Sequence, residues 1–137
     1  MPEYDVAPSA RFIAIAPQFV VPDLMAAAEY YRDVLGFEIL GYLGEPPRFA
    51  MVSRDNVEIH LGQSNGGATA GSNSSRRKHG VDAYVWVEDV DILAAELKKR
   101  GARIVDGPAA RPYGLRELVI EDLNGFRIAF GTHPDSE

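Results

Sequence analysis

The chain carries the same pattern twice, and this repeat constrains its fold more than any other feature. The segments FVVPDLMAAAEYYRDVLGFEI (residues 19–39) and VWVEDVDILAAELKKRGARI (residues 85–104) align when Asp23 is matched to Asp89. In both, an apolar run of strand type precedes the Asp, an amphipathic stretch follows it, and a glycine closes the unit. A second pair of similar segments comes after each: FAMVSRDNVEIHLG (residues 49–62) and LVIEDLNGFRIAFG (residues 118–131). Two copies of one unit can face each other and enclose a pocket.

Each copy predicts the order strand, helix and three strands. Asp23 and Asp89 are good helix N-caps, and Gly36 and Gly101 suit left-handed helix ends. We therefore expect an α+β fold, in which two tandem βαβββ units form a curved, mostly antiparallel sheet cavity with helices outside. The first strand is predicted over residues 12–21, residues 107–114 are predicted as a loop, and Asn124-Gly125 as a two-residue hairpin turn.

The predicted organisation is a single domain over residues 1–137. It comprises an arm (1–10), a first unit (11–62), a linker (63–80), a second unit (81–132) and a tail (133–137). The linker is rich in Gly, Ser and Asn, which is typical of a flexible connection between the halves or of a mobile flap over a site.

Composition narrows the classes of function. Hydrophobic residues make up 46% and charged residues 25% of the chain, which is typical of a globular domain. No apolar run reaches the length of a membrane span, and no secretory signal is expected at the N-terminus. The absence of cysteine excludes disulfides and zinc–thiolate sites and favours the cytoplasm. The net charge of −6 disfavours nucleic acid and anionic membranes as partners and permits a neutral or cationic small ligand.

Alternation along the strands predicts which side chains lie away from the helices. The aliphatic set of the VDAYVWV segment belongs under a helix, which leaves Asp82, Tyr84 and Trp86 on the opposite, open face. The same reasoning places the smaller residues of the first strand, Gln18 among them, on that side. From the other strands it adds Glu58, His60, Glu117 and Arg127. Aromatic rings beside carboxylates are typical of a pocket wall or a subunit interface rather than of a plain solvated face.

Three segments resemble one family closely: VVPDLMAAAEYYRDVLGFEIL, VWVEDVDILAAELKKRGARIV and GPAARPYGLRELVIEDLNGFRIAFG. They are similar to the vicinal-oxygen-chelate superfamily, which includes glyoxalase I, extradiol dioxygenases, fosfomycin-resistance enzymes and bleomycin-resistance proteins. The last segment is most like the bleomycin-resistance branch. The resemblance covers about residues 12–132, and because the superfamily supports many chemistries on one scaffold, it implies the fold more strongly than the function.

The resemblance also implies where a metal would bind. Metal-dependent members carry one ligand on the first strand and one on the last strand of each unit, and these positions correspond here to Ala16, His60, Asp82 and Ala129. Two methyl groups cannot coordinate a metal, so we expect no metal and no other cofactor. The alternative is a divalent-metal enzyme of the glyoxalase or dioxygenase type that uses His60 with Glu58, Asp82 or Gln18.

His60 has two further interpretations that do not need a metal. It is either a partly buried strand histidine hydrogen-bonded to Asp82 or Glu58, or a contact for the ligand. If the protein is an enzyme without a metal, His60 is the catalytic candidate, with Asp82 as its acid–base partner.

Without a metal, the expected ligand is an organic molecule bound by stacking and charge. Trp86, Tyr84 and Tyr113 offer aromatic faces, whereas Asp82, Glu58 and Glu117 offer carboxylates, partly neutralised by Arg116 and Arg127. The resemblance implies a homodimer that sequesters a cationic aromatic drug, as in antibiotic resistance, with exchange of the N-terminal arm or of one unit between subunits.

Overall fold

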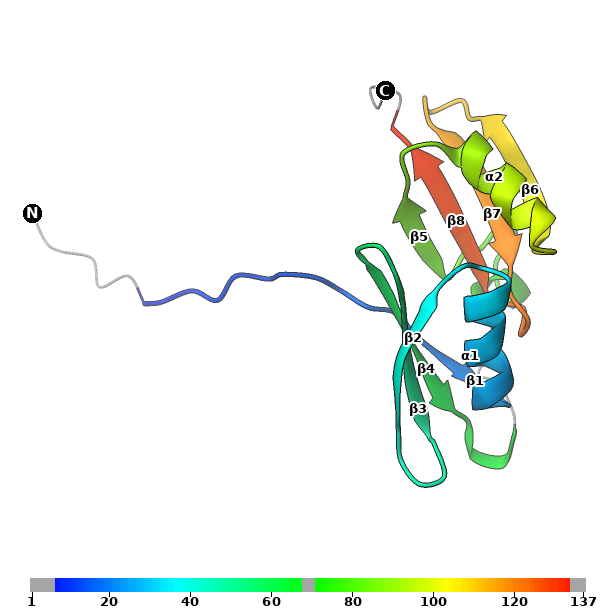
Figure 1. Ribbon diagram of the computed structural model, residues 1–137. Helices are drawn as coiled ribbons and strands as arrows, with labels where there is room; N and C mark the ends of the chain where they lie inside the picture. Colours follow the sequence, from blue (N-terminus) through cyan, green and yellow to red (C-terminus); the bar gives the residue numbers. More distant parts are fainter. Residues whose placement is uncertain (1–6, 68–70, 134–137) are drawn as a thin grey trace, which may run out of the picture.

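The computed structural model describes residues 7–67 and 71–133. Two four-stranded sheets carry one helix each, and both helices lie on the same side of the molecule (Figure 1). The first half contains β1 (Gln18–Val21), α1 (Leu24–Asp33), β2 (Glu38–Leu43), β3 (Phe49–Arg54) and β4 (Val57–Gln63). The second contains β5 (Ala83–Trp86), α2 (Val90–Lys99), β6 (Arg103–Ala110), β7 (Arg116–Glu121) and β8 (Arg127–Thr132). The predicted pair of βαβββ units is confirmed.

The two sheets have the same topology, and they stay open instead of closing into a barrel. Their strand orders are β1-β4-β3-β2 and β5-β8-β7-β6. The first strand of each unit pairs in parallel with the last, and the other pairs are antiparallel. Two short 3-10 turns, Asn65–Gly67 and Asn73–Ser75, lie between the sheets along the chain. No helix in the described ranges is long and apolar enough to cross a membrane.

The predicted N-caps and the predicted C-terminal glycines of the two helices are confirmed. The carboxylate of Asp23 accepts a hydrogen bond from the Ala26 amide at 3.1 Å, and that of Asp89 accepts one from the Ile92 amide at 3.1 Å. Gly36 and Gly101 end the helical turns with φ of +78° and +89°, a region that favours glycine. The inward faces of both helices are buried (Leu24, Ala27, Ala28 and Tyr31; Val90, Leu93, Ala94 and Leu97).

The first strand is much shorter than predicted. Residues 12–17 form no ladder, and Figure 1 shows the segment from residue 7 onward running away from both sheets. Phe12, Ile13 and Ile15 are more than 90% exposed. The prediction of a strand over residues 12–21 is therefore wrong for most of its length. Within residues 7–67 and 71–133, nothing packs against the apolar side chains of this arm.

Two other sequence predictions also need correction. β6 continues to Ala110, so the first part of the segment predicted as a loop (residues 107–110) is strand, whereas residues 111–114 lie in the turn before β7. Pro108 is tolerated there because β6 is an edge strand with two irregularities in register. The turn between β7 and β8 spans residues 122–126 instead of two residues, and Asp122 closes it by accepting hydrogen bonds from the Asn124 and Phe126 amides.

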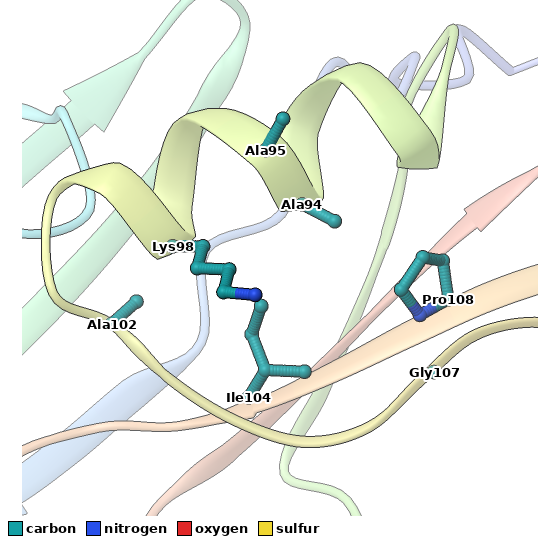
Figure 2. Close-up of a pocket in the computed structure, with 7 residues that line it drawn as sticks. All are labelled: Ala94, Ala95, Lys98, Ala102, Ile104, Gly107 and Pro108. Carbon is teal, nitrogen blue, oxygen red and sulfur yellow. The ribbon is translucent and has the colours of Figure 1, made fainter.

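A groove of about 430 Å³ lies between α2 and the edge strand β6 (Figure 2). Small residues of α2 form one wall, and the other comes from the segment around Ile104 and Pro108. The Lys98 side chain extends across the groove. This groove is on the helix side of the sheet, opposite the side on which the polar and aromatic residues gather.

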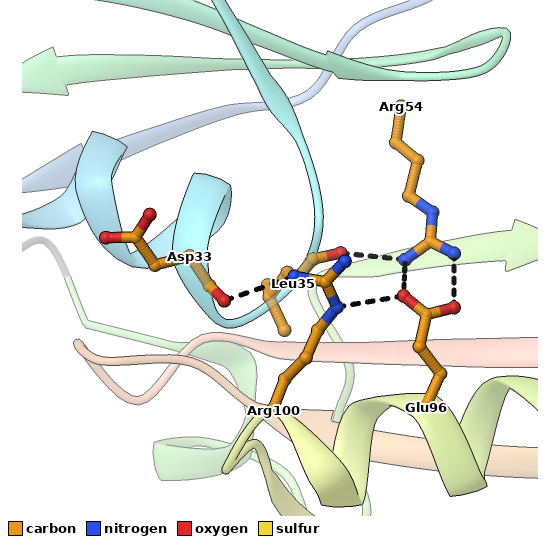
Figure 3. Close-up of polar contacts among 5 residues, drawn as sticks. All are labelled: Asp33, Leu35, Arg54, Glu96 and Arg100. Atoms are coloured by element: carbon orange, nitrogen blue, oxygen red, sulfur yellow. Dashed lines mark hydrogen bonds and ion pairs between the residues drawn. The ribbon is translucent and has the colours of Figure 1, made fainter.

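The two halves are fastened together by polar bridges and a shared core. Arg54 of β3 forms a two-pronged ion pair with Glu96 of α2, at 2.9 and 2.7 Å, and also donates to the Leu35 carbonyl (Figure 3). Arg100 joins the same Glu96 and reaches the Asp33 carbonyl. Phe19 stacks on Phe126 with ring centres 4.5 Å apart. Each chain therefore holds its own two halves in contact, with one continuous core.

Candidate functional site

On the first sheet, His60 is held by its neighbour Glu58. His60 Nε2 lies 2.5 Å from Glu58 Oε2, and the Phe49 ring packs edge-on against the imidazole at 5.2 Å. Gln18 is the cross-strand partner of His60 in the parallel β1–β4 pair. These side chains share the face opposite the helix, since Ile59 and Leu61 between them point into the core. Of the two partners considered for His60, the structure shows Glu58.

The carboxylate of Asp82 binds backbone amides. Its two carboxylate oxygens accept hydrogen bonds from the Asn73 and Arg127 amides, both at 2.8 Å. Asn73 in turn donates its side-chain amide to the Val81 carbonyl at 3.0 Å. These bonds fasten the segment after residue 71 to the start of β5. Asp82 therefore organises the linker instead of presenting a free charge to a ligand.

Glu117 is the centre of a buried polar cluster on the second sheet. Its side chain accepts hydrogen bonds from the hydroxyl of Tyr84 at 2.6 Å, from the hydroxyl of Tyr113 and from Arg111 Nε at 3.2 Å. Arg111 also pairs with Asp106 at 2.9 Å. Glu117 is only 7% exposed, so these donors replace the water that its carboxylate has lost.

The cluster shifts the titration of its members. Burial acts to raise the pKa of Glu117, but the hydrogen bonds from Tyr113, Tyr84 and Arg111 outweigh it and hold that pKa below its ordinary value. The pKa of Tyr84 is raised by burial and by its bond to Glu117. The pKa of Tyr113 is raised chiefly by its bond to the same carboxylate. At neutral pH the cluster therefore holds an ionised Glu117 and two protonated phenols.

Above this cluster lies an exposed row of aromatic rings. Trp86 is 55% exposed, with the Tyr84 ring 5.0 Å away on one side and the His133 ring stacked at 5.0 Å on the other. Tyr84 and Trp86 alternate with residues that pack toward α2, so both rings lie on the open face of the second sheet. An exposed aromatic surface of this kind suits stacking against a flat molecule.

The four positions implied for a metal do not fit one. Ala16 lies in the arm before β1, and Ala129 is a buried residue opposite Tyr84. Asp82 is occupied by backbone amides, which leaves His60 with Glu58. Within residues 7–67 and 71–133, no three His, Cys, Asp or Glu side chains gather in a way that could hold a metal ion.

Two residues of this face were not predicted from the sequence, and a third lies elsewhere than predicted. Arg111 stands in the segment predicted as a loop, and nothing in its spacing shows that it reaches Glu117. His133, to which no role was assigned, stacks on Trp86. Arg116, expected to neutralise the acids of the face, pairs instead with Asp91 of α2 at 2.7 and 2.8 Å.

Neither of two cavities in the described part of the chain is lined by residues of both units. The groove beside α2 is lined by residues of the second half alone. A second cavity, lined by residues from His79 to Arg127, likewise takes nothing from the first half. The open faces of the two sheets thus do not combine in either cavity.

Comparison with known proteins is consistent with this architecture. An ethylmalonyl-CoA/methylmalonyl-CoA epimerase of Cereibacter sphaeroides is 32% identical over 116 residues, covering 77% of this chain and 86% of the relative. The solved structure of TnmS3, an antibiotic-binding protein from Streptomyces sp. CB03234, has a TM-score of 0.65 at 24% identity, over 90% of this chain and 99% of that one. A bleomycin-binding protein complexed with bleomycin has a TM-score of 0.68 at 15% identity, over 89% and 99%.

These similarities to solved structures show the fold. Membership of a family is shown by a family model. It matches residues 13–130, from the arm before β1 into β8, and so spans nearly all of both βαβββ units. The chain belongs to the Glyoxalase/Bleomycin resistance protein/Dioxygenase superfamily.

Proposed function

We propose that this protein is a metal-independent, homodimeric binding protein that sequesters a flat organic molecule. The observation that carries the proposal is the position of Trp86, exposed on the open face of the second sheet between the rings of Tyr84 and His133. A large exposed aromatic group of this kind marks a binding surface more often than a plain solvated one.

The chemistry of the face favours stacking over ion pairing. Glu117 is saturated by three donors, Asp82 by two backbone amides, and Glu58 is paired with His60. A cationic ligand would therefore gain from the faces of Trp86 and Tyr84, through cation–π contact, more than from a free carboxylate. A planar aromatic ligand, cationic or neutral, is the class that this surface suits.

A second copy of the chain would complete the site. Neither of the two cavities described above combines the open faces of the two sheets, and the arm before β1 exposes Phe12, Ile13 and Ile15. Burying an apolar side chain of this size contributes about 1.5–3 kcal/mol, so an arm packed on a partner would stabilise a dimer substantially. In our proposal, the partner's first sheet covers the aromatic row of the second.

Relatives support the ligand class without identifying the ligand. The similar solved structures include an antibiotic-binding protein and a bleomycin-binding protein with its drug. On this basis we propose that the ligand belongs to the class of complex natural products and that the protein confers resistance by sequestration. The cysteine-free composition fits a cytoplasmic location for that activity.

Isothermal titration calorimetry of chelator-treated protein tests the proposal. Bleomycin and a panel of planar aromatic amines are the probes, and we expect saturable binding of at least one of them without added metal. Trp86→Ala should weaken that binding by about tenfold or more, since base–aromatic stacking of comparable geometry contributes about 1–3 kcal/mol. Leu123→Ala, which removes an exposed apolar residue of the β7–β8 turn, is the matched control and should bind normally. Uniform absence of binding would contradict the proposal.

The second candidate is an enzyme of the epimerase type, favoured by the 32% identity to the Cereibacter sphaeroides protein and by the pairing of His60 with Glu58. Elemental analysis of protein purified without chelators, together with an epimerisation assay on methylmalonyl-CoA, separates the two candidates. Stoichiometric metal and turnover that is lost in His60→Ala would establish the enzyme and end the sequestration proposal.

A further inference from the structure

A second cavity, of about 370 Å³, lies on the second sheet, and its lining includes none of the rings of the aromatic row. Its lining combines one guanidinium, one imidazole, one carboxylate and three valines (His79, Gly80, Val81, Val105, Asp106, Val119 and Arg127). Arg127 and Gly131 are four residues apart along β8, roughly 13 Å at the usual rise of a strand. Gly131 pairs with Trp86, so the cavity and the aromatic row occupy different ends of the sheet.

The linker builds one wall of this cavity and is held there by specific contacts. Asp82 binds the Asn73 amide through one oxygen and the Arg127 amide through the other. Gly80 is buried so closely against Asn73 that a Cβ atom would lie 2.6 Å from the Asn73 carbonyl oxygen. His79 adopts φ of +62°, which is uncommon for a residue other than glycine. The linker therefore presents His79 and Val81 at the cavity in a defined conformation.

Arg127 brings a positive charge that its surroundings leave uncompensated. Its cross-strand partner Glu121 pairs with Arg103 at 3.2 Å, and Asp106, in the cavity lining, pairs with Arg111 at 2.9 Å. Among the described residues, Arg127 forms no ion pair within 4.0 Å, and its Nε is buried without a hydrogen-bond partner. A buried donor without an acceptor destabilises the protein, and a ligand with an anionic oxygen could supply the missing acceptor.

We propose that this cavity binds the carboxylate of a small apolar acid. The guanidinium of Arg127 matches a planar carboxylate with two parallel donors, and His79 offers a further donor at the mouth. The valines at 81, 105 and 119 suit a short hydrocarbon or aromatic body behind the carboxylate. A phosphate, with more charge and three acceptor oxygens, would meet too few donors among these walls. The lining contains none of the three rings of the aromatic row, so this proposal does not rest on the proposed function.

Benzoate is the direct probe, with benzamide as its neutral counterpart of the same shape and inorganic phosphate as the competing anion. Titrations of the full chain followed by ¹H–¹⁵N NMR can observe the Nε–H resonance of Arg127 itself. We expect benzoate to shift this resonance saturably at millimolar concentrations, and benzamide and phosphate to bind at least about tenfold more weakly. Equal binding of benzamide, tighter binding of phosphate, or no binding of benzoate would overturn the proposal.

Variants test the assignment to Arg127. Arg127→Gln should weaken benzoate binding at least about tenfold. Arg127→Lys keeps the charge but loses the planar pair of donors, so its affinity for benzoate should lie between those of the wild type and Arg127→Gln. Arg116→Gln is the control: it removes a guanidinium of the same sheet that is paired with Asp91, and it should bind benzoate as the wild type does. His79 is an exposed residue of the linker, and asparagine readily adopts the positive φ found there. His79→Asn therefore tests the site without altering the sheet, and it should weaken benzoate binding about two- to fivefold. Unchanged affinity in both Arg127→Gln and His79→Asn would refute the site.

Discussion

The hydroxyl of Tyr84 donates a hydrogen bond to Glu117 at 2.6 Å, across the backbone of Gly131. This bond joins the buried polar cluster to the exposed aromatic row, because the Tyr84 ring lies 5.0 Å from that of Trp86. The orientation of the proposed stacking surface is thus set by a carboxylate beneath it. Glu117 acts in this account as a positioning residue for the rings and not as a charge that meets the ligand.

Gly131 makes the approach of Tyr84 to Glu117 possible. A Cβ atom at this position would lie 2.7 Å from Tyr84 Cζ, so Gly131→Ala should displace the phenol from Glu117 and lower the free energy of unfolding by about 1–3 kcal/mol. Gly62 is the equivalent residue of the first half, where an added Cβ meets only Gln18 at an ordinary 3.5 Å. Gly62→Ala should therefore be nearly neutral in thermal unfolding. Equal effects of the two substitutions would contradict the packing described.

Glu117→Gln should destabilise the protein in a pH-dependent manner. Hydrogen bonds hold the folded-state pKa of Glu117 below its ordinary value, so its ionised form contributes stability above the unfolded-state value of about 4.3. We expect a loss of about 1–3 kcal/mol at pH 7. This difference from the wild type should shrink as the pH falls below about 4, because the wild-type carboxylate then becomes protonated as well.

Denaturant unfolding of both proteins between pH 3 and pH 7 measures this effect. Glu38→Gln, an exposed position of β2, is the control and should leave stability unchanged within about 0.5 kcal/mol at every pH. A loss in Glu117→Gln that stays constant down to pH 3 would show that the ionised carboxylate is not what stabilises the cluster.

Tyr31→Phe tests the buried contact between the two halves. The Tyr31 hydroxyl donates to Asp122 at 2.7 Å, and both residues are buried. Its removal leaves the Asp122 carboxylate short of one donor and should cost about 1–3 kcal/mol in chemical unfolding. Tyr30→Phe changes a neighbouring, half-buried phenol without such a bond and should cost less than about 0.5 kcal/mol. The idea fails if the two variants are equally stable.

The repeat and its alternation predicted much of the fold and of the open face. Aligning Asp23 with Asp89 located both helix starts, and alternation placed Tyr84 and Trp86 opposite the helix. These signals are local, since capping and strand alternation depend on a few neighbouring residues. They could not show that the apolar alternation of residues 12–17 lacks a partner within the chain.

The polar pairings were much less predictable. Arg111, not Arg116, neutralises Glu117, because the extension of β6 to Ala110 brings Arg111 alongside β7. The choice depends on the irregular register of an edge strand, which no periodicity in the sequence encodes. His133 likewise follows β8 directly and reaches Trp86 only through the parallel pairing of β5 with β8.

The exposed arm predicts how the dimer can be broken. Replacing Phe12, Ile13 and Ile15 together with serine should convert a dimer into a monomer in sedimentation velocity experiments. Since these side chains make no core contacts in their own chain, the folded content by circular dichroism should not change. Leu123→Ser, at another exposed apolar position, should remain dimeric. A wild-type protein that is monomeric at all concentrations would remove the dimer from the account.

The most direct test of the central claim uses Trp86, which is the only tryptophan of the chain. Its intrinsic fluorescence reports on the proposed stacking surface alone, so metal-free protein can be titrated with bleomycin and with planar aromatic amines. We expect saturable quenching by at least one of these ligands, at one site per subunit, and loss of this quenching when Gly131→Ala displaces Tyr84. Unchanged fluorescence across the whole panel, together with metal-dependent turnover of methylmalonyl-CoA, would contradict it.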